Sequence, residues 1–247
     1  MLTGTQVRRG SRTALLVVLA AIAALSLAPA ARPAPGEFVR LSDERTRTLS
    51  AYVLHSVWVR RSPRAAAQKL ARLRTATWHG FPEVVVLLGE QTVGRGSWSY
   101  IRYPGLGRRR GWVPSRALSS ATLHKRRLVL DRDRLRLKLF QGRRLLFNAP
   151  VGIGARGSPT PAGRYYVRER LGPFSSANSV YGALAFGLSA FSSHRTDWPG
   201  GGQVGIHGTN HPALIPGRIS NGCVRLTNAK VLRLGRLLRV GTPLSIR

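Results

Sequence analysis

The 247-residue chain is poor in cysteine, since Cys223 is its one thiol. A single cysteine cannot form a disulfide within the chain, so the fold must be stabilised by its packed core. A lone thiol is either an inert buried side chain, a link between two chains, or a nucleophile kept for chemistry. Which of these applies depends on its neighbours.

Long apolar runs are also absent, except near the N-terminus. Arg8, Arg9 and Arg12 precede an apolar run at 14–28. This run is shorter than the roughly 20 residues of a membrane-spanning helix and is typical of a signal-peptide core. We therefore predict a signal peptide at 1–31, with an uncleaved membrane anchor as the alternative. Either one predicts export to the outer face of the membrane or the cell wall.

Acidic residues are scarce, with 9 Asp plus Glu against 40 Lys plus Arg and a formal net charge of +31. Only four of the cations are lysines, and the arginines are spread over every segment. This spread is not typical of a patch that tracks nucleic-acid phosphates. For an exported protein it favours anionic cell-envelope polymers as partners, with no nucleic acid. We expect a monomer.

The chain after the leader reads as mainly β, in two modules. Residues 32–50 are polar and basic, as in a linker. Residues 51–120 contain short β-rich runs at 84–88, 97–101 and 111–113. With these runs the segment resembles a small SH3-like β-barrel module. Ala-rich sequence at 65–73 leaves a short helix open. Four tryptophans are expected to fill this module's core, with stacking on sugars or peptides as the alternative: Trp58, Trp78, Trp98 and Trp112.

Residues 121–247 are expected to form a second module. Leucines alternate with cations at 134–139, which predicts a strand with one wet face, and a turn at 141–143 leads into a returning strand at 144–153. Further strands are expected at 165–167 and 244–246. The Gly-, Ser- and Pro-rich stretch at 172–202 is expected to be a functional loop. Asn228 is expected to cap the module's one clear helix.

The surroundings of Cys223 favour a reactive thiol. Gly222 and the turn formers Ser220 and Asn221 precede it, and the cation Arg225 follows two positions later. His207 lies sixteen positions before it. A nearby imidazole can take the proton of a thiol and stabilise the thiolate, which is the nucleophilic form.

Several motifs of this half match one family: residues 160–163 (TPAG), 181–182 (YG), 206–209 (IHGT), 220–225 (SNGCVR) and 241–246 (GTPLSI). On these the segment 128–247 resembles the catalytic domain of L,D-transpeptidases (YkuD-like), which cross-link bacterial peptidoglycan through a cysteine. The resemblance implies a β-sandwich with one helix and no cofactor. Members commonly carry histidine where this chain has Asn221.

The chemistry and the resemblance together assign roles. Cys223 is the expected nucleophile and His207 the general base and acid. No carboxylate lies in the motif, so we expect a backbone carbonyl, that of Gly208, to orient His207. The N–H groups of Gly222 and Cys223 are the expected oxyanion donors.

Four further residues receive secondary roles. Arg225 is expected to hold the thiolate, a substrate carboxylate or the loop. Ser220 and Asn221 shape the turn. Tyr181 and Thr209 are the substrate-binding candidates that the family motifs supply. Asp197 is expected to be dispensable.

By resemblance, the donor is a tetrapeptide stem whose terminal D-alanine leaves as a thioester forms on Cys223. An amine of a second stem then completes a 3-3 crosslink, or water completes an L,D-carboxypeptidase reaction, and carbapenem-type β-lactams acylate the same thiol. Two alternatives remain. One is a zinc site of His207, His211 and Cys223, although Gly208 and Pro212 disfavour the helix that this spacing needs. The other is a non-catalytic wall-binding protein.

Overall fold

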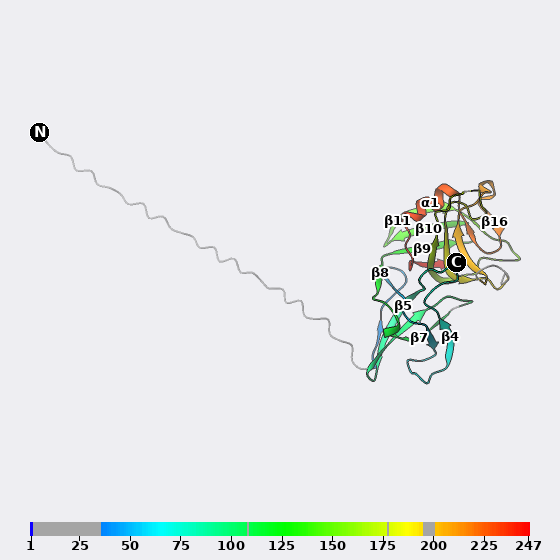
Figure 1. Ribbon diagram of the computed structural model, residues 1–247. Helices are drawn as coiled ribbons and strands as arrows, with labels where there is room; N and C mark the ends of the chain where they lie inside the picture. The colour runs from blue at the N-terminus through cyan, green and yellow to red at the C-terminus, as the bar shows by residue number, and fades with distance from the viewer. Residues whose placement is uncertain (2–35, 108, 177, 195–200) are drawn as a thin grey trace. The chain divides into compact units, whose positions relative to one another are not determined.

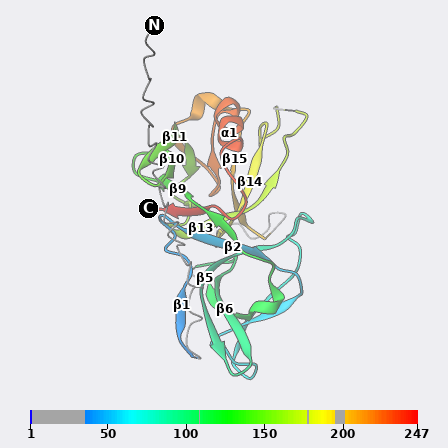
Figure 2. The same ribbon diagram turned by 90° about the vertical axis from the view of Figure 1, so that its left-hand side faces the viewer.

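The computed structural model describes residue 1 and residues 36–107, 109–176, 178–194 and 201–247 (Figure 1). The predicted signal peptide therefore lies outside the described residues, as does Asp197. No helix among the residues described is long and apolar enough to cross a membrane. The described residues from 36 onward belong to one compact unit, which contains two β-sheets (Figure 2).

The first sheet has the strand order β4-β3-β7-β6-β5-β2-β8, with β1 paired to β5. Its elements are β1 (Phe38–Arg40), β2 (Thr48–Tyr52), β3 (Val57–Arg60), β4 (Lys69–Leu73), β5 (Val84–Val93), β6 (Gly96–Arg102), β7 (Arg110–Pro114), the short 3-10 helix η1 (Ser115–Ala117) and β8 (Thr122–His124). These strands confirm a β-rich N-terminal module. Its SH3-like character stays a prediction.

One local prediction of secondary structure for this sheet was wrong, and one alternative left open is not observed. The expected linker contains β1 and most of β2, in which Thr48 and Ser50 are buried; Ser50 Oγ lies 2.8 Å from His124 Nε2. The stretch left open as a helix ends in strand β4. Strand pairing with β3 there outweighs the local helix preference of alanine.

The tryptophans do not fill the core. Trp78 is 72% exposed and Trp58 38%, while Trp98 and Trp112 are half-buried. Side chains alternate along a strand, so Val59 and Val113 point into the core while their neighbours Trp58 and Trp112 point away from it. Aliphatic residues therefore supply most of this core.

The second sheet has the order β11-β10-β9-β18-β13-β14-β15-β17-β12-β16. Its elements are β9 (Arg126–Asp131), β10 (Arg136–Gln141), β11 (Arg144–Pro150), β12 (Gly152–Gly154), β13 (Gly163–Leu171), β14 (Ala185–Phe191), β15 (Gln203–His207), the 3-10 helix η2 (Pro212–Leu214), β16 (Gly217–Ser220), β17 (Val224–Arg225), α1 (Asn228–Gly235) and β18 (Pro243–Ile246). The predicted hairpin is confirmed as β10 and β11, and α1 is the one α-helix among the described residues. The mainly β class is confirmed.

Two predictions for this half need correction. The expected loop at 172–202 contains strand β14, which pairs with β13 on one side and β15 on the other. Asn228 is the first residue of α1 rather than its cap, and Thr227 occupies the cap position. The side chain of Asn228 is engaged at the functional site instead.

Strand β5 joins the two sheets. Val85 and Leu87 face the core of the first sheet, while Val84, Val86 and Leu88 pack with Tyr166 of β13. The hydroxyl of Tyr166 donates to Val84 O at 2.9 Å. Arg168 of β13 forms a buried ion pair with Glu83, which precedes β5. Apolar residues thus face both sides of β5, which explains its continuous hydrophobic run.

Candidate active site

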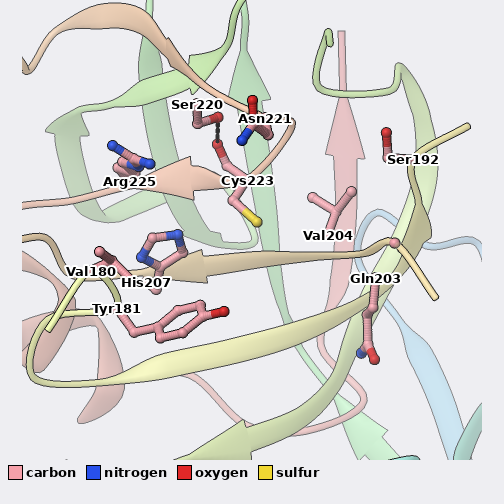
Figure 3. Close-up of a pocket in the computed structure, with 11 residues that line it drawn as sticks. Val180, Tyr181, Ser192, Gln203, Val204, His207, Ser220, Asn221, Cys223 and Arg225 are labelled. Carbon is pink, nitrogen blue, oxygen red and sulfur yellow. Dashed lines mark hydrogen bonds between the residues drawn. The ribbon is translucent and has the colours of Figure 1, made fainter. Parts of the chain in front are cut away.

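Adjacent parallel strands bring Cys223 and His207 together. Strand β15 pairs with β17 so that Ile206 lies opposite Val224 and His207 opposite Arg225. Ile206 and Val224 are buried in the core, so His207, Arg225 and Cys223 lie on the opposite face of these strands. Figure 3 shows the thiol and the imidazole on the same side, and both line the same cavity.

The thiol has a fixed hydrogen-bond partner. The N–H of Gly205, two residues before His207, donates to Cys223 Sγ at 3.3 Å. Cys223 is half-buried, so the sulfur is neither sealed in the core nor fully in water. The thiol of Cys223 and the imidazole of His207 therefore line one cavity despite their separation in sequence.

The turn before Cys223 is held by two hydroxyl groups. Ser220 Oγ donates to Cys223 O at 2.6 Å and accepts from Gly222 N–H at 3.2 Å (Figure 3). Thr160 Oγ1 donates to Gly222 O at 2.8 Å and accepts from Gly154 N–H at 2.9 Å. Gly222 has φ +115°, a conformation that favours glycine. The expected oxyanion donor Gly222 N–H is therefore already engaged with Ser220.

A backbone carbonyl orients the imidazole, as the lack of a nearby carboxylate predicted. His207 Nδ1 lies 2.6 Å from Gly208 O. A carbonyl oxygen only accepts, so Nδ1 carries the proton and the lone pair is left on Nε2. The ring of Tyr181 packs edge-on against His207, with centroids 5.3 Å apart and planes at 67°. This tautomer is the one that a general base requires.

Asn228 fixes the segment that carries this carbonyl. Its Oδ1 accepts from Ala183 N–H at 3.0 Å and from Thr209 N–H at 3.2 Å. A Cβ added to Gly208 would lie 2.2 Å from the same oxygen, and one added to Gly182 would lie 2.1 Å from it. Sequence reasoning treated Asn228 as a helix cap and missed this role. Its position in α1, behind the Tyr181–Gly182 and His207–Gly208 segments, is visible only in the fold.

Burial keeps both reacting groups neutral. Desolvation lowers the pKa of His207 to about 4, with the Arg225 charge acting in the same direction and the Gly208 hydrogen bond opposing it. Desolvation also raises the pKa of the Cys223 thiol, against the Gly205 hydrogen bond and the Arg225 charge. Both shifts favour the uncharged forms, a thiol and a neutral imidazole.

Arg225 gives the first cavity its charge. This cavity of about 80 Å³ is lined by Val180, Tyr181, Ser192, Gly202, Gln203, Val204, His207, Ser220, Asn221, Cys223 and Arg225. Arg225 Nε is buried, with no hydrogen-bond partner among the described residues. The lining residues that the structure describes include no carboxylate. A guanidinium in this setting suits a substrate carboxylate, one of the roles expected for it.

A second cavity of about 260 Å³ reaches Cys223 as well. It shares Tyr181, Gln203, Val204, His207 and Cys223 with the first, and adds His79, Glu169, Leu171, Phe174, Ala185, Phe186, Gly187 and Gly205. His79 comes from the segment between β4 and β5 of the N-terminal module. Sequence reasoning missed both His79 and Glu169, because their 90-residue separation gives no local signal.

The remaining predicted site residues lie around this centre. Asn221 lines the first cavity and Tyr181 lines both. Thr209 is buried, its hydroxyl accepts from His211 N–H, and it is not among the lining residues of either cavity. Within the described part of the chain, no three His, Cys, Asp or Glu side chains are grouped as a metal site would need.

Known proteins match the C-terminal half. The L,D-transpeptidase catalytic domain model, YkuD, matches residues 125–246. The "Putative L,D-transpeptidase YkuD" of Bacillus licheniformis is 31% identical over 124 residues, covering 49% of this chain and 64% of the relative. Its counterpart in Bacillus subtilis is 32% identical over 114 residues, covering 44% and 58%.

The chain thus spans about three fifths of the length of these relatives. A solved L,D-transpeptidase from Mycobacterium smegmatis aligns with 87% of this chain and 95% of its own at 15% identity, with a TM-score of 0.37. The family match includes His207, Cys223 and every strand from β9 to β18. Residues 125–246 belong to the L,D-transpeptidase catalytic domain family.

Proposed function

We propose that this protein is a peptidoglycan L,D-transpeptidase that works through a thioester on Cys223. The observation that carries the proposal is the shared face of β15 and β17, where thiol, neutral imidazole and Arg225 line one cavity. An acyl transfer needs a nucleophile, a base that is unprotonated at neutral pH, and an anchor for the substrate. These three side chains supply them.

In the first half-reaction, Cys223 attacks the carbonyl carbon of the bond before the terminal D-alanine of a tetrapeptide stem. His207 Nε2 takes the thiol proton as the S–C bond forms and returns it to the departing amine as the C–N bond breaks. The Cys223 N–H is the remaining candidate oxyanion donor, since Gly222 N–H donates to Ser220. Arg225 binds the carboxylate of the departing D-alanine.

In the second half-reaction, an amine of another stem attacks the thioester and forms the crosslink, and Cys223 is regenerated. The cationic surface holds the exported protein, as a monomer, among the anionic polymers of the cell envelope. Stem peptides and these polymers are the proposed partners.

Tetrapeptide-bearing muropeptides test the proposal. D-alanine release with a crosslinked product supports a transpeptidase, and release without a crosslink indicates an L,D-carboxypeptidase. Sedimentation with wall sacculi and no D-alanine release indicates a non-catalytic binder and contradicts the proposal. Cys223→Ala is the matched control, because it removes only the sulfur and must abolish release.

A further inference from the structure

The two cavities that meet at Cys223 differ in charge. The first contains Arg225 and, among its described lining residues, no carboxylate. The second contains Glu169 and His79, and its described lining residues include no Arg or Lys. A reaction with two substrates at one sulfur atom needs two approaches to it. The first cavity, with Arg225, suits the carboxylate of a departing group, and the second cavity, with Glu169, suits a group that brings a positive charge.

Glu169 is fixed at the wall of the second cavity. Its side chain is fully buried on β13. Oε2 accepts from Thr77 Oγ1 at 2.6 Å, and Oε1 accepts from Gln203 Nε2 at 2.9 Å and His79 Nδ1 at 3.1 Å. A Cβ on Gly187 would lie 2.5 Å from both Glu169 Oε1 and Gln203 Nε2, so the absence of a side chain there leaves room for the carboxylate.

The contact with Glu169 fixes which ring nitrogen of His79 carries the proton. A carboxylate only accepts hydrogen bonds, so His79 Nδ1 carries a proton and Nε2 has the free lone pair. The hydrogen bond to Glu169 Oε1 also holds the imidazole ring at the wall of the cavity. The side chain of His79 is 35% exposed, so a proton received there has a route to solvent.

A short hairpin between β4 and β5, outside the strands of the sheet, carries His79 to the cavity. Ala76 pairs with Pro82, Thr77 N–H donates to Phe81 O at 2.7 Å, and Gly80 N–H donates to Thr77 O at 3.1 Å. Thr77 also anchors this hairpin to Glu169. The N-terminal module therefore contributes a side chain to a cavity that contains the nucleophile.

We propose that the second cavity is the acyl-acceptor site, in which His79, backed by Glu169, deprotonates the incoming ammonium group. This inference rests on the proposed function and adds to it the residues that select an amine. Glu169 is a positioning residue, because it acts through His79. The N-terminal module is then part of the catalytic machinery rather than a separate binding module.

Proton counting leaves one proton of the ammonium that the sulfur does not take, and we assign it to His79. After the first half-reaction His207 is neutral again, since it has passed the thiol proton to D-alanine. The ammonium gives one proton to His79 Nε2, and the resulting amine attacks the thioester carbon. The C–N bond forms, the C–S bond breaks, and His207 carries the second amine proton to the sulfur. The products are an amide, the Cys223 thiol and one proton on His79, which passes to water.

The experiment compares two acceptors on full-length protein. With a tetrapeptide donor, Nα-acetyl-lysine brings an ammonium, while hydroxylamine is already uncharged at neutral pH. His79→Gln and Glu169→Gln are expected to lower kcat for transfer to Nα-acetyl-lysine about 100-fold, within the range of general-base effects, and to change transfer to hydroxylamine less than about twofold. His55→Gln, an exposed histidine of the same module that lines neither cavity, is the control.

Two outcomes would overturn the inference. Equal losses of kcat with both acceptors would mean that His79 and Glu169 only shape the cavity. No loss of kcat with either acceptor would mean that His79 is not the base. If Glu169→Gln does not fold, His79→Gln alone is decisive, because His79 lies on a partly exposed hairpin. If the wild-type protein releases D-alanine and the variants show either of these two outcomes, this inference is refuted and the proposed function is not. Absence of D-alanine release from wild type refutes the proposed function and this inference with it.

Discussion

Lowering the pH from 7 to 5.5 is expected to leave the rate of Cys223 acylation by a carbapenem nearly unchanged. The rate depends on the neutral fraction of His207, which is 5% exposed and whose pKa burial lowers to about 4. With that pKa, more than roughly nine tenths of the imidazole is neutral at both pH values. A histidine at its usual pKa of about 6.5 would lose neutral form about eightfold over this interval.

The same pKa affects stability, and the sign is fixed. The folded-state pKa of His207 is below its unfolded value, so the unfolded chain binds a proton first as the pH falls. Stability is then lost between about pH 6.5 and pH 4, to a total of about 3 kcal/mol for this residue. Burial also lowers the pKa of His124 to about 4, so it adds a loss of similar size over the same interval.

The assay is the time course of the covalent mass increase at both pH values, with circular dichroism to establish that the protein stays folded. An eightfold slower reaction of folded protein at pH 5.5, with an apparent pKa near 6.5, would refute the argument that burial keeps His207 neutral. A rate within about 1.5-fold supports it.

Three further outcomes are expected. Gly208→Ala places a Cβ 2.2 Å from Asn228 Oδ1, so it should lower the free energy of unfolding in urea by about 1–3 kcal/mol and slow the acylation of Cys223. Gly157→Ala is the control, because its Cβ would have nothing within 4 Å, and it should change neither quantity. Glu83→Gln leaves Arg168 buried without its counter-ion and should lower the free energy of unfolding by about 3–5 kcal/mol. Asp133→Asn is the control, because that side chain is 95% exposed, and it should change stability by less than about 0.5 kcal/mol. Binding to wall sacculi should weaken steadily as NaCl is added, and salt-independent binding would contradict the charge argument.

Local patterns predicted much of the C-terminal fold. The alternation of leucine and cation at 134–139 predicted the β10–β11 hairpin, because a strand with one wet face has a period of two. The polar strand β2 was missed because Thr48 and Ser50 are buried, Ser50 in a hydrogen bond with His124, and composition does not reveal this. Trp78 was assigned to the core on size alone, yet it lies on the exposed hairpin beside His79.

The candidate site also contains some residues that the sequence predicted and others that it did not. Cys223 and His207 were predicted from thiol chemistry together with the family resemblance, and the carbonyl of Gly208 from the lack of a carboxylate in the motif. Asn228, His79 and Glu169 were not, because their roles arise from contacts between segments tens of residues apart. Those contacts depend on sheet order, which no local pattern specifies.

The central claim is that Cys223 is an accessible nucleophile activated by His207. Intact-mass measurement after incubation with a carbapenem tests it most directly. The wild-type chain is expected to gain the mass of one carbapenem, a Cys223→Ser variant none, and a His207→Gln variant the same mass far more slowly. No mass gain by folded wild-type protein, or an equal gain by the Cys223→Ser variant, would contradict the account.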